Sequence, residues 1–107
     1  LEGANLEDAG LYRANLYAAN LNGANLSRAN LYAADLRGAN LEGADLRGTS
    51  LRYTNLKNRD FSVYDLTGAD LTGANILNAN FEGANLNNAV WIDGTKCSLG
   101  SIGKCAK

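Results

Sequence analysis

The chain has 107 residues, with 10 Lys or Arg against 11 Asp or Glu and no histidine. This length fits one domain, and a net charge of −1 gives no strong field to attract nucleic acid. No apolar stretch approaches the roughly 20 residues of a transmembrane helix, and no signal-type leader opens the chain, so we expect no membrane insertion.

A five-residue repeat runs from Leu1 to Leu86. Leu, Phe or Ile stands at every fifth position, which gives 18 consecutive centres, and Trp91 takes the next. Alanine usually stands two residues before a centre, Asn or Asp directly before it, and glycine is common two residues after it. This period fits neither a helix nor a long strand. We therefore expect Ala-Asn-Leu to form a short strand with one buried face, followed by a corner in which glycine supplies the positive φ of a type II turn.

This pattern resembles the pentapeptide repeat family, whose motif is A(D/N)LXX and whose fold is an all-β, right-handed quadrilateral parallel β-helix. The resemblance covers residues 1 to about 91. It implies that four units make one square coil of about 20 residues, so that the 18 units form about four and a half coils. The 20-residue spacing of Phe61 from Phe81, and of Tyr12 from Tyr32, supports this coil independently. Such units bury their leucines only when coils stack.

The segment 59–65, with the sequence RDFSVYD, interrupts this regularity. The inward alanine position carries Thr49, Thr54, Arg59 and Tyr64 in four consecutive units, one on each side of a single coil. Threonine is close to alanine in size, so we expect both threonines to remain inside. Arginine and tyrosine do not fit alanine sites, and a buried guanidinium without partners would cost several kcal/mol.

We therefore predict that the corner from Phe61 to Tyr64 bulges. Arg59 and Tyr64 are expected to turn partly outward, toward Asp60, Asp65 and backbone carbonyls. Two interpretations stay open, a tolerated irregularity of the scaffold and a recognition notch.

The motif decays after Leu86, and residues 92–107 form a glycine-containing tail. We expect a repeat domain over 1–91 with Trp91 plugging its last coil, and a C-terminal cap over 92–107. The two cysteines, Cys97 and Cys105, both lie in the tail. A disulfide would staple a cap that has little core and would indicate an oxidising compartment. Two free thiols are the first alternative, and a metal site the second, although two thiolates without histidine make half a zinc ligand set.

The tail is also similar to C-terminal segments of cyanobacterial and chloroplast lumenal members of the family. This similarity implies the thylakoid lumen or the periplasm rather than the cytoplasm. The residues that carry it are Trp91, Asp93, Gly94, Cys97, Gly100, Ser101, Gly103 and Cys105.

The 20-residue coil separates charges on the outer surface. One corner lacks basic residues and carries Glu2, Asn22, Glu42, Ser62 and Glu82. Two other corners combine tyrosine with arginine or lysine, a composition that suits contacts with a protein or an anionic ligand, although a merely solvated surface is the alternative. With the two irregular residues added, the candidate interaction surface comprises Tyr12, Arg13, Tyr17, Tyr32, Arg37, Arg52, Tyr53, Lys57, Arg59 and Tyr64.

Enzyme chemistry has little support in the sequence. There is no imidazole base, the cysteines lack a histidine partner, and most carboxylates, such as those of Asp45 and Asp65, stand on outward positions. The glycines stand at the corners with the same five-residue spacing as the repeat, and they form no phosphate-binding loop. We expect no enzymatic activity, no cofactor, no metal and no small-molecule substrate.

A structural or adaptor scaffold that binds an unidentified protein is the favoured function. The family resemblance implies an alternative, because some members mimic duplex DNA and bind type II topoisomerases such as gyrase. Those members are strongly acidic, whereas the present charge is nearly balanced. Nucleic-acid binding through the Tyr and Arg corners is a third possibility, which the acidic corner and the net charge oppose.

Overall fold

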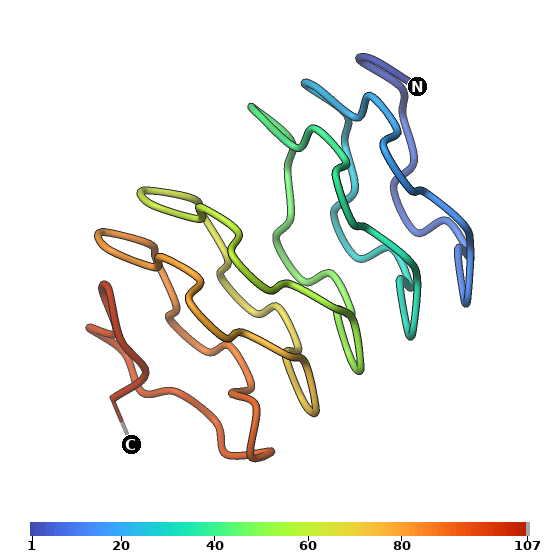
Figure 1. Cartoon of the computed structure of the whole chain (residues 1–107). Coiled ribbons are helices and arrows are strands. Elements are labelled where there is room, and N and C mark those ends of the chain that lie inside the picture. Colours follow the sequence, from blue (N-terminus) through green and yellow to red (C-terminus); the bar gives the residue numbers. More distant parts are fainter. Residues whose placement is uncertain (107) are drawn as a thin grey trace.

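The computed structural model describes residues 1–106 as one stack of coils, about 34 × 22 × 21 Å in extent (Figure 1). Over these residues there is no helix and no continuous strand, and the coils pair through single-residue bridges. The parallel bridges join residues 20 positions apart, for example Asn5 with Asn25 and Asn25 with Asp45, so four units make one circuit. Residues 1–106 accordingly include no candidate membrane-spanning helix.

Each corner is a tight turn with the same backbone geometry. The alanine N–H donates to the carbonyl of the preceding centre, as Ala4 does to Leu1 at 2.9 Å. The second corner residue has a positive φ, between 54° and 72°, in all 18 units from Gly3 to Asn88, whereas the first corner residue does not. This combination distinguishes type II from type I′ turns. The predicted turn is therefore present, although only eight of these positions are glycine.

The asparagine or aspartate before each centre accepts a hydrogen bond from a backbone N–H group of the following corner. In the unit that follows Asn25, Leu26 donates its N–H to Asp45 O of the next coil, and Arg28 donates to Arg47 O. The remaining donor of the first corner residue, the N–H of Ser27, binds Asn25 Oδ1 at 3.0 Å. The Asx side chain thus satisfies the backbone donor that the neighbouring coil does not reach.

The core is a column of leucine and alanine along the axis. Leu21, Leu26 and Leu31 are fully buried. Phe61 and Phe81 continue the column as a stacked pair with centroids 5.4 Å apart. The first coil lacks a neighbour on one side, and Leu1 is accordingly 59% exposed.

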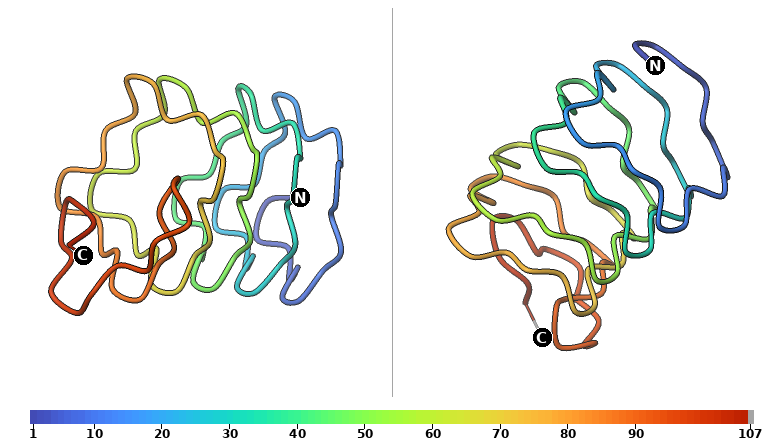
Figure 2. Two further views of the ribbon diagram at one scale, coloured as in Figure 1. Left: turned by 90° about the horizontal axis from the view of Figure 1, so that it is seen from below. Right: turned by 45° about the vertical axis from the view of Figure 1, so that its right-hand side comes forward.

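The tail folds back against the last coil, where it is drawn in red (Figure 2). Leu86 donates its N–H to Ser101 O at 2.7 Å, and Cys97 donates to Ala89 O at 2.7 Å, so the tail covers two open sides of the coil. The predicted disulfide joins Cys97 to Cys105, with their Cα atoms 5.0 Å apart. Trp91 contacts Phe81 edge-on at 5.3 Å between centroids, at the end of the core.

The stack opens at one level, between segments 34–46 and 54–66. Within residues 1–106, no bridge joins Asp35 to Asn55, Asn40 to Asp60, or Asp45 to Asp65, although Ser50 pairs with both Asn30 and Asp70. Three sides of the square are therefore separated while the fourth remains closed. Figure 1 shows the green and yellow-green coils spread apart on one side of the stack. We call this interval the split.

The split leaves backbone donors without acceptors. Within the described chain, no hydrogen bond is made by the backbone N–H groups of Leu36, Gly38, Leu41, Gly43, Leu46, Asn55, Asp60 and Asp65. The predicted bulge is wrong, because the Phe61–Tyr64 turn keeps its 3.0 Å hydrogen bond and its positive φ at Val63. The local turn is therefore regular at this level, and the irregularity lies in the spacing between the coils.

Candidate functional site

The first candidate site is a ladder of stacked side chains along one corner. Tyr12 and Tyr32, 20 residues apart, stack with ring centroids 5.2 Å apart, and Tyr32 meets Tyr53 edge-on at 5.4 Å. Arg13 lies over the Tyr12 ring at 5.1 Å from its guanidinium carbon. Arg52 lies 5.7 Å from the Tyr32 centroid and 5.9 Å from that of Tyr53. We call these five residues the Tyr–Arg edge.

The Tyr–Arg edge is open to solvent and positively charged. Tyr12 is 54% exposed and Tyr53 is 53% exposed. Arg13 forms no ion pair within residues 1–106, and Arg52 reaches Asp70 only at 3.8 Å. The Nε atom of Arg52 is buried without a hydrogen-bond partner in the same region. Rigid aromatic rings beside weakly paired guanidinium groups are typical of protein-binding surfaces.

The next corner carries a separate pair. The Arg37 guanidinium lies over Tyr17 at 5.5 Å and also clamps the Asp35 carboxylate through two hydrogen bonds of 2.9 and 2.8 Å. Donation from Arg37 lowers the pKa of Asp35 to about 2. The depressed pKa means that the clamp persists at neutral pH and is lost only as the pH falls toward 2.

Arg59 enters the split as a half-buried side chain. Its guanidinium donates to the carbonyls of Ala39 and Leu36, which lie on the opposite wall. The predicted carbonyl partners are thus present, but the predicted contacts with Asp60 and Asp65 are wrong, since no ion pair links either to Arg59. Burial lowers the pKa of Arg59, because no carboxylate compensates its charge.

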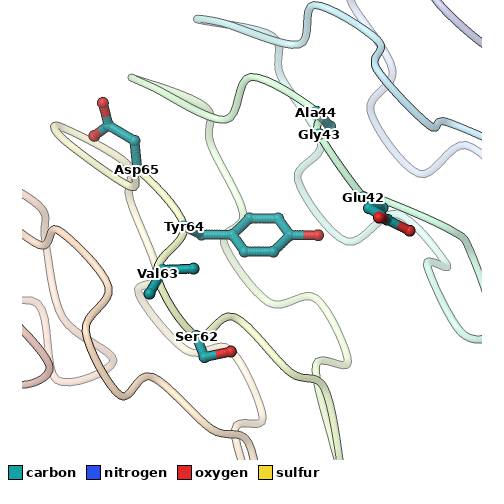
Figure 3. Close-up of a pocket in the computed structure, with 7 residues that line it drawn as sticks. All are labelled: Glu42, Gly43, Ala44, Ser62, Val63, Tyr64 and Asp65. Atoms are coloured by element: carbon teal, nitrogen blue, oxygen red, sulfur yellow. The ribbon is translucent and has the colours of Figure 1, made fainter.

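Tyr64 enters the split at the next side. Its ring meets Phe61 edge-on at 5.4 Å, and Figure 3 shows it extending from its own coil toward the segment that carries Glu42. Burial raises the pKa of the Tyr64 phenol. Around the ring lies an opening of about 340 Å³, lined by Glu42, Gly43, Ala44, Ser62, Val63, Tyr64 and Asp65. Both irregular side chains are half-buried, which agrees with the prediction that they turn partly outward. Thr49 and Thr54 stay inside, as predicted, and donate to Leu26 O and Leu51 O.

A second opening of about 250 Å³ lies in the split beside Arg59. Arg37 and Gly38 form one wall, and Lys57 and Arg59 belong to the other. Asn55 and Asn58 complete the lining.

The ten predicted surface residues therefore fall into four groups. Five form the Tyr–Arg edge, and Tyr17 belongs to the neighbouring corner. Arg37, Lys57 and Arg59 meet at the smaller opening, whereas Tyr64 stands at the larger one. Sequence reasoning missed the unpaired backbone donors of the split. The replacement of alanine in four consecutive units marks the level at which the split lies, but it does not indicate that the coils separate there.

The titratable groups offer little for metal chemistry. In the part of the chain described, no group of three or more His, Cys, Asp or Glu residues is placed to hold a metal ion. The candidate sites instead combine aromatic rings, guanidinium groups and unpaired backbone donors, which suit recognition.

Comparison with known proteins agrees with the coil geometry. The profile described as "Pentapeptide repeat region" matches residues 14–91. The chain belongs to the pentapeptide repeat family. No curated protein matches it significantly.

Solved structures of the same family resemble most of the fold. Rfr23 from the cyanobacterium Cyanothece 51142 gives a TM-score of 0.72 at 37% identity, covering 81% of this chain and 73% of that one. HetL from the cyanobacterium Nostoc sp. PCC 7120 is a protein involved in heterocyst differentiation regulation. Its structure gives a TM-score of 0.69 at 29% identity, and the match covers 90% of this chain and 52% of HetL. A pentapeptide repeat protein of the Arabidopsis thaliana thylakoid lumen gives a TM-score of 0.60 at 30% identity, and the match covers 83% of this chain and 66% of that protein. The chain thus spans about half the length of HetL and about two thirds of the lumenal protein.

Proposed function

We propose that the protein is a non-enzymatic adaptor scaffold, a right-handed quadrilateral β-helix of about four and a half coils that binds a partner protein through the Tyr–Arg edge. The observation that carries this proposal is the continuous contact of Tyr12, Tyr32 and Tyr53 with two interleaved arginines. The rings are held by one another, so little side-chain freedom is lost when a partner covers them.

The charges of the edge favour a partner that presents carboxylates beside apolar groups. A partner carboxylate would pair with Arg13, while the rings supply apolar contact area. The same guanidinium groups oppose mimicry of DNA, because a DNA mimic presents negative charge to its target. The gyrase-binding alternative therefore has no supporting feature on this edge.

An oxidising compartment, the thylakoid lumen or the periplasm, is the proposed location. The Cys97–Cys105 disulfide supports it, since structural disulfides persist where thiols are not kept reduced. The origin of one structural neighbour in the thylakoid lumen and of two in cyanobacteria supports it as well.

Quantitative affinity capture from cyanobacterial and chloroplast extracts tests the proposed edge. The variant Tyr12→Ala/Tyr32→Ala/Arg52→Ala truncates three of the five side chains of the Tyr–Arg edge. The control Val63→Ala/Leu99→Ala/Lys104→Ala removes two exposed apolar side chains and one cation elsewhere. We expect a partner retained by the wild type and the control, and reduced at least tenfold by the edge variant. Equal retention by all three folded proteins would rule out the edge as the binding surface.

A further inference from the structure

The smaller opening in the split contains a positive charge that the chain itself does not neutralise. Arg59 is half-buried, and it forms no ion pair within residues 1–106. Its two hydrogen bonds go to neutral backbone carbonyls, which satisfy donors but leave the charge uncompensated. A partly buried ion gains strongly from a counter-charge, because the surrounding dielectric is lower than that of water.

Further donors converge on the same opening. Lys57 lines it and has no acidic partner in the described chain. The N–H of Gly38, on the opposite wall, has lost the acceptor that the next coil supplies elsewhere in the stack. A guanidinium, an ammonium and a backbone N–H together form the usual donor set for a tetrahedral oxyanion.

Asp35 and Asp60 flank the lining in sequence, but neither forms an ion pair with Lys57 or Arg59 within residues 1–106. Asp35 is clamped by Arg37. The pKa of Asp60 is lowered by hydrogen bonds from Ser62, chiefly from its hydroxyl and also from its N–H at 2.9 Å. Arg37 is thereby neutralised, whereas Lys57 and Arg59 give the opening a net positive charge.

We propose that the split binds a phosphate group between Gly38, Lys57 and Arg59. The opening of about 250 Å³ has room for a phosphate, and all three of these residues line it. The phosphate could be inorganic phosphate or a phosphorylated side chain of a protein. This site is separate from the Tyr–Arg edge and does not depend on the function proposed for that edge.

Titration with inorganic phosphate, followed by amide NMR at constant ionic strength, tests the site. We expect saturable shifts of the Gly38 and Lys57 amide signals. Lys57→Gln should weaken binding at least fivefold, because it removes one cation without touching the core. Lys104→Gln makes the same charge change in the tail and should alter affinity less than twofold. An equal effect of the two substitutions would overturn the proposal.

A second variant and a second probe complete the test. Arg59→Ala/Tyr64→Ala removes both side chains that occupy the split, including the Arg59 guanidinium. The phosphate-induced shift of the Gly38 amide signal should then disappear, although Lys57 is retained. A phosphoserine peptide, compared with its serine form, distinguishes the two sources. Binding of the phosphopeptide at least tenfold tighter than inorganic phosphate identifies a phosphorylated protein, and comparable binding identifies the free ion. Saturation by neither probe would exclude the site.

Discussion

Val63 occupies a backbone conformation that is unfavourable for its residue type. Its φ is 57°, where the corresponding corner of neighbouring coils carries Gly43 or Gly83. A left-handed conformation costs an L-residue roughly 1 to 2 kcal/mol, and β-branching makes it worse. The side chain is 82% exposed, so it returns little packing energy.

Val63→Gly should therefore stabilise the protein. We expect a gain of about 1 kcal/mol, after subtracting the greater entropy of glycine in the unfolded chain. Ser62→Gly is the matched control, because the neighbouring position has no positive φ and should lose stability. Urea unfolding of both variants checks the expectation, and a loss of stability in Val63→Gly would contradict it.

Gly10 tests the role of the Asx side chain. It replaces the usual Asn or Asp, and the Tyr12 N–H consequently has no acceptor among the described residues. A Cβ atom at Gly10 would meet no atom within 4 Å, and the φ of this residue is not positive. Gly10→Asn should gain about 1 kcal/mol from the new hydrogen bond and from reduced unfolded-state entropy. Gly10→Ala isolates the entropy contribution and should gain about half as much; equal gains in thermal unfolding would show that the Asx bond contributes nothing.

At the scale of elements, the cap is the segment with the least core of its own. Cys97 is buried, and the remaining contacts are mainly backbone hydrogen bonds and the two bonds that Asn87 Oδ1 accepts from Gly100 and Ser101. Cross-linking two residues eight apart is worth about 2.5 kcal/mol in the chain-entropy account.

Cys97→Ala/Cys105→Ala should loosen the cap without unfolding the coils. We expect hydrogen exchange at the Leu86 and Gly103 amides, which bond across the cap boundary, to accelerate at least tenfold. The Asn30 amide, which donates to Ala9 O in the first coils, should be unaffected. Equal acceleration at all three amides would show that the disulfide stabilises the whole stack rather than the cap.

The repeating elements were predictable from the sequence, and the split was not. Period and residue type identify the turn, because only one residue per unit must adopt a positive φ and glycine often stands there. The 20-residue spacing of Tyr12 from Tyr32 likewise predicts a contact that the structure contains. The way in which the structure accommodates Arg59 and Tyr64 depends instead on which costs less free energy, a distortion of the turn or the loss of hydrogen bonds between coils. That balance between side-chain volume and several weak hydrogen bonds is not encoded in residue identity alone.

At the scale of the whole molecule, the split divides the stack into two blocks joined along one side. Ser50 maintains pairing with both neighbouring coils, so this side acts as the closed edge of a wedge. Stability should therefore be non-uniform, and the weakest level should lie in the middle of the stack as well as at its ends.

Hydrogen exchange in the wild type offers a direct test of the wedge. The Leu41 and Leu46 amides should exchange quickly although their side chains are buried, because their N–H groups have no acceptor within residues 1–106. The Leu26 and Leu31 amides, which donate to Asp45 and Ser50 carbonyls, should be protected. Equal protection of the two pairs would show that the coils are closed in solution.

Removing the two wedging side chains should close the stack. In Arg59→Ala/Tyr64→Ala the alanine spacing is restored, and eight backbone N–H groups regain acceptors in the facing coil. At about 1 kcal/mol for each hydrogen bond, less the packing lost with Tyr64, we expect a gain of about 2 kcal/mol or more. Thr49→Ala/Thr54→Ala restores alanine in the same coil but removes two satisfied hydroxyls, so it should lose stability and leave the split open. Slow exchange at Leu41 in the first variant and fast exchange in the second would establish that Arg59 and Tyr64 hold the coils apart. Fast exchange in both would assign the opening to the backbone instead.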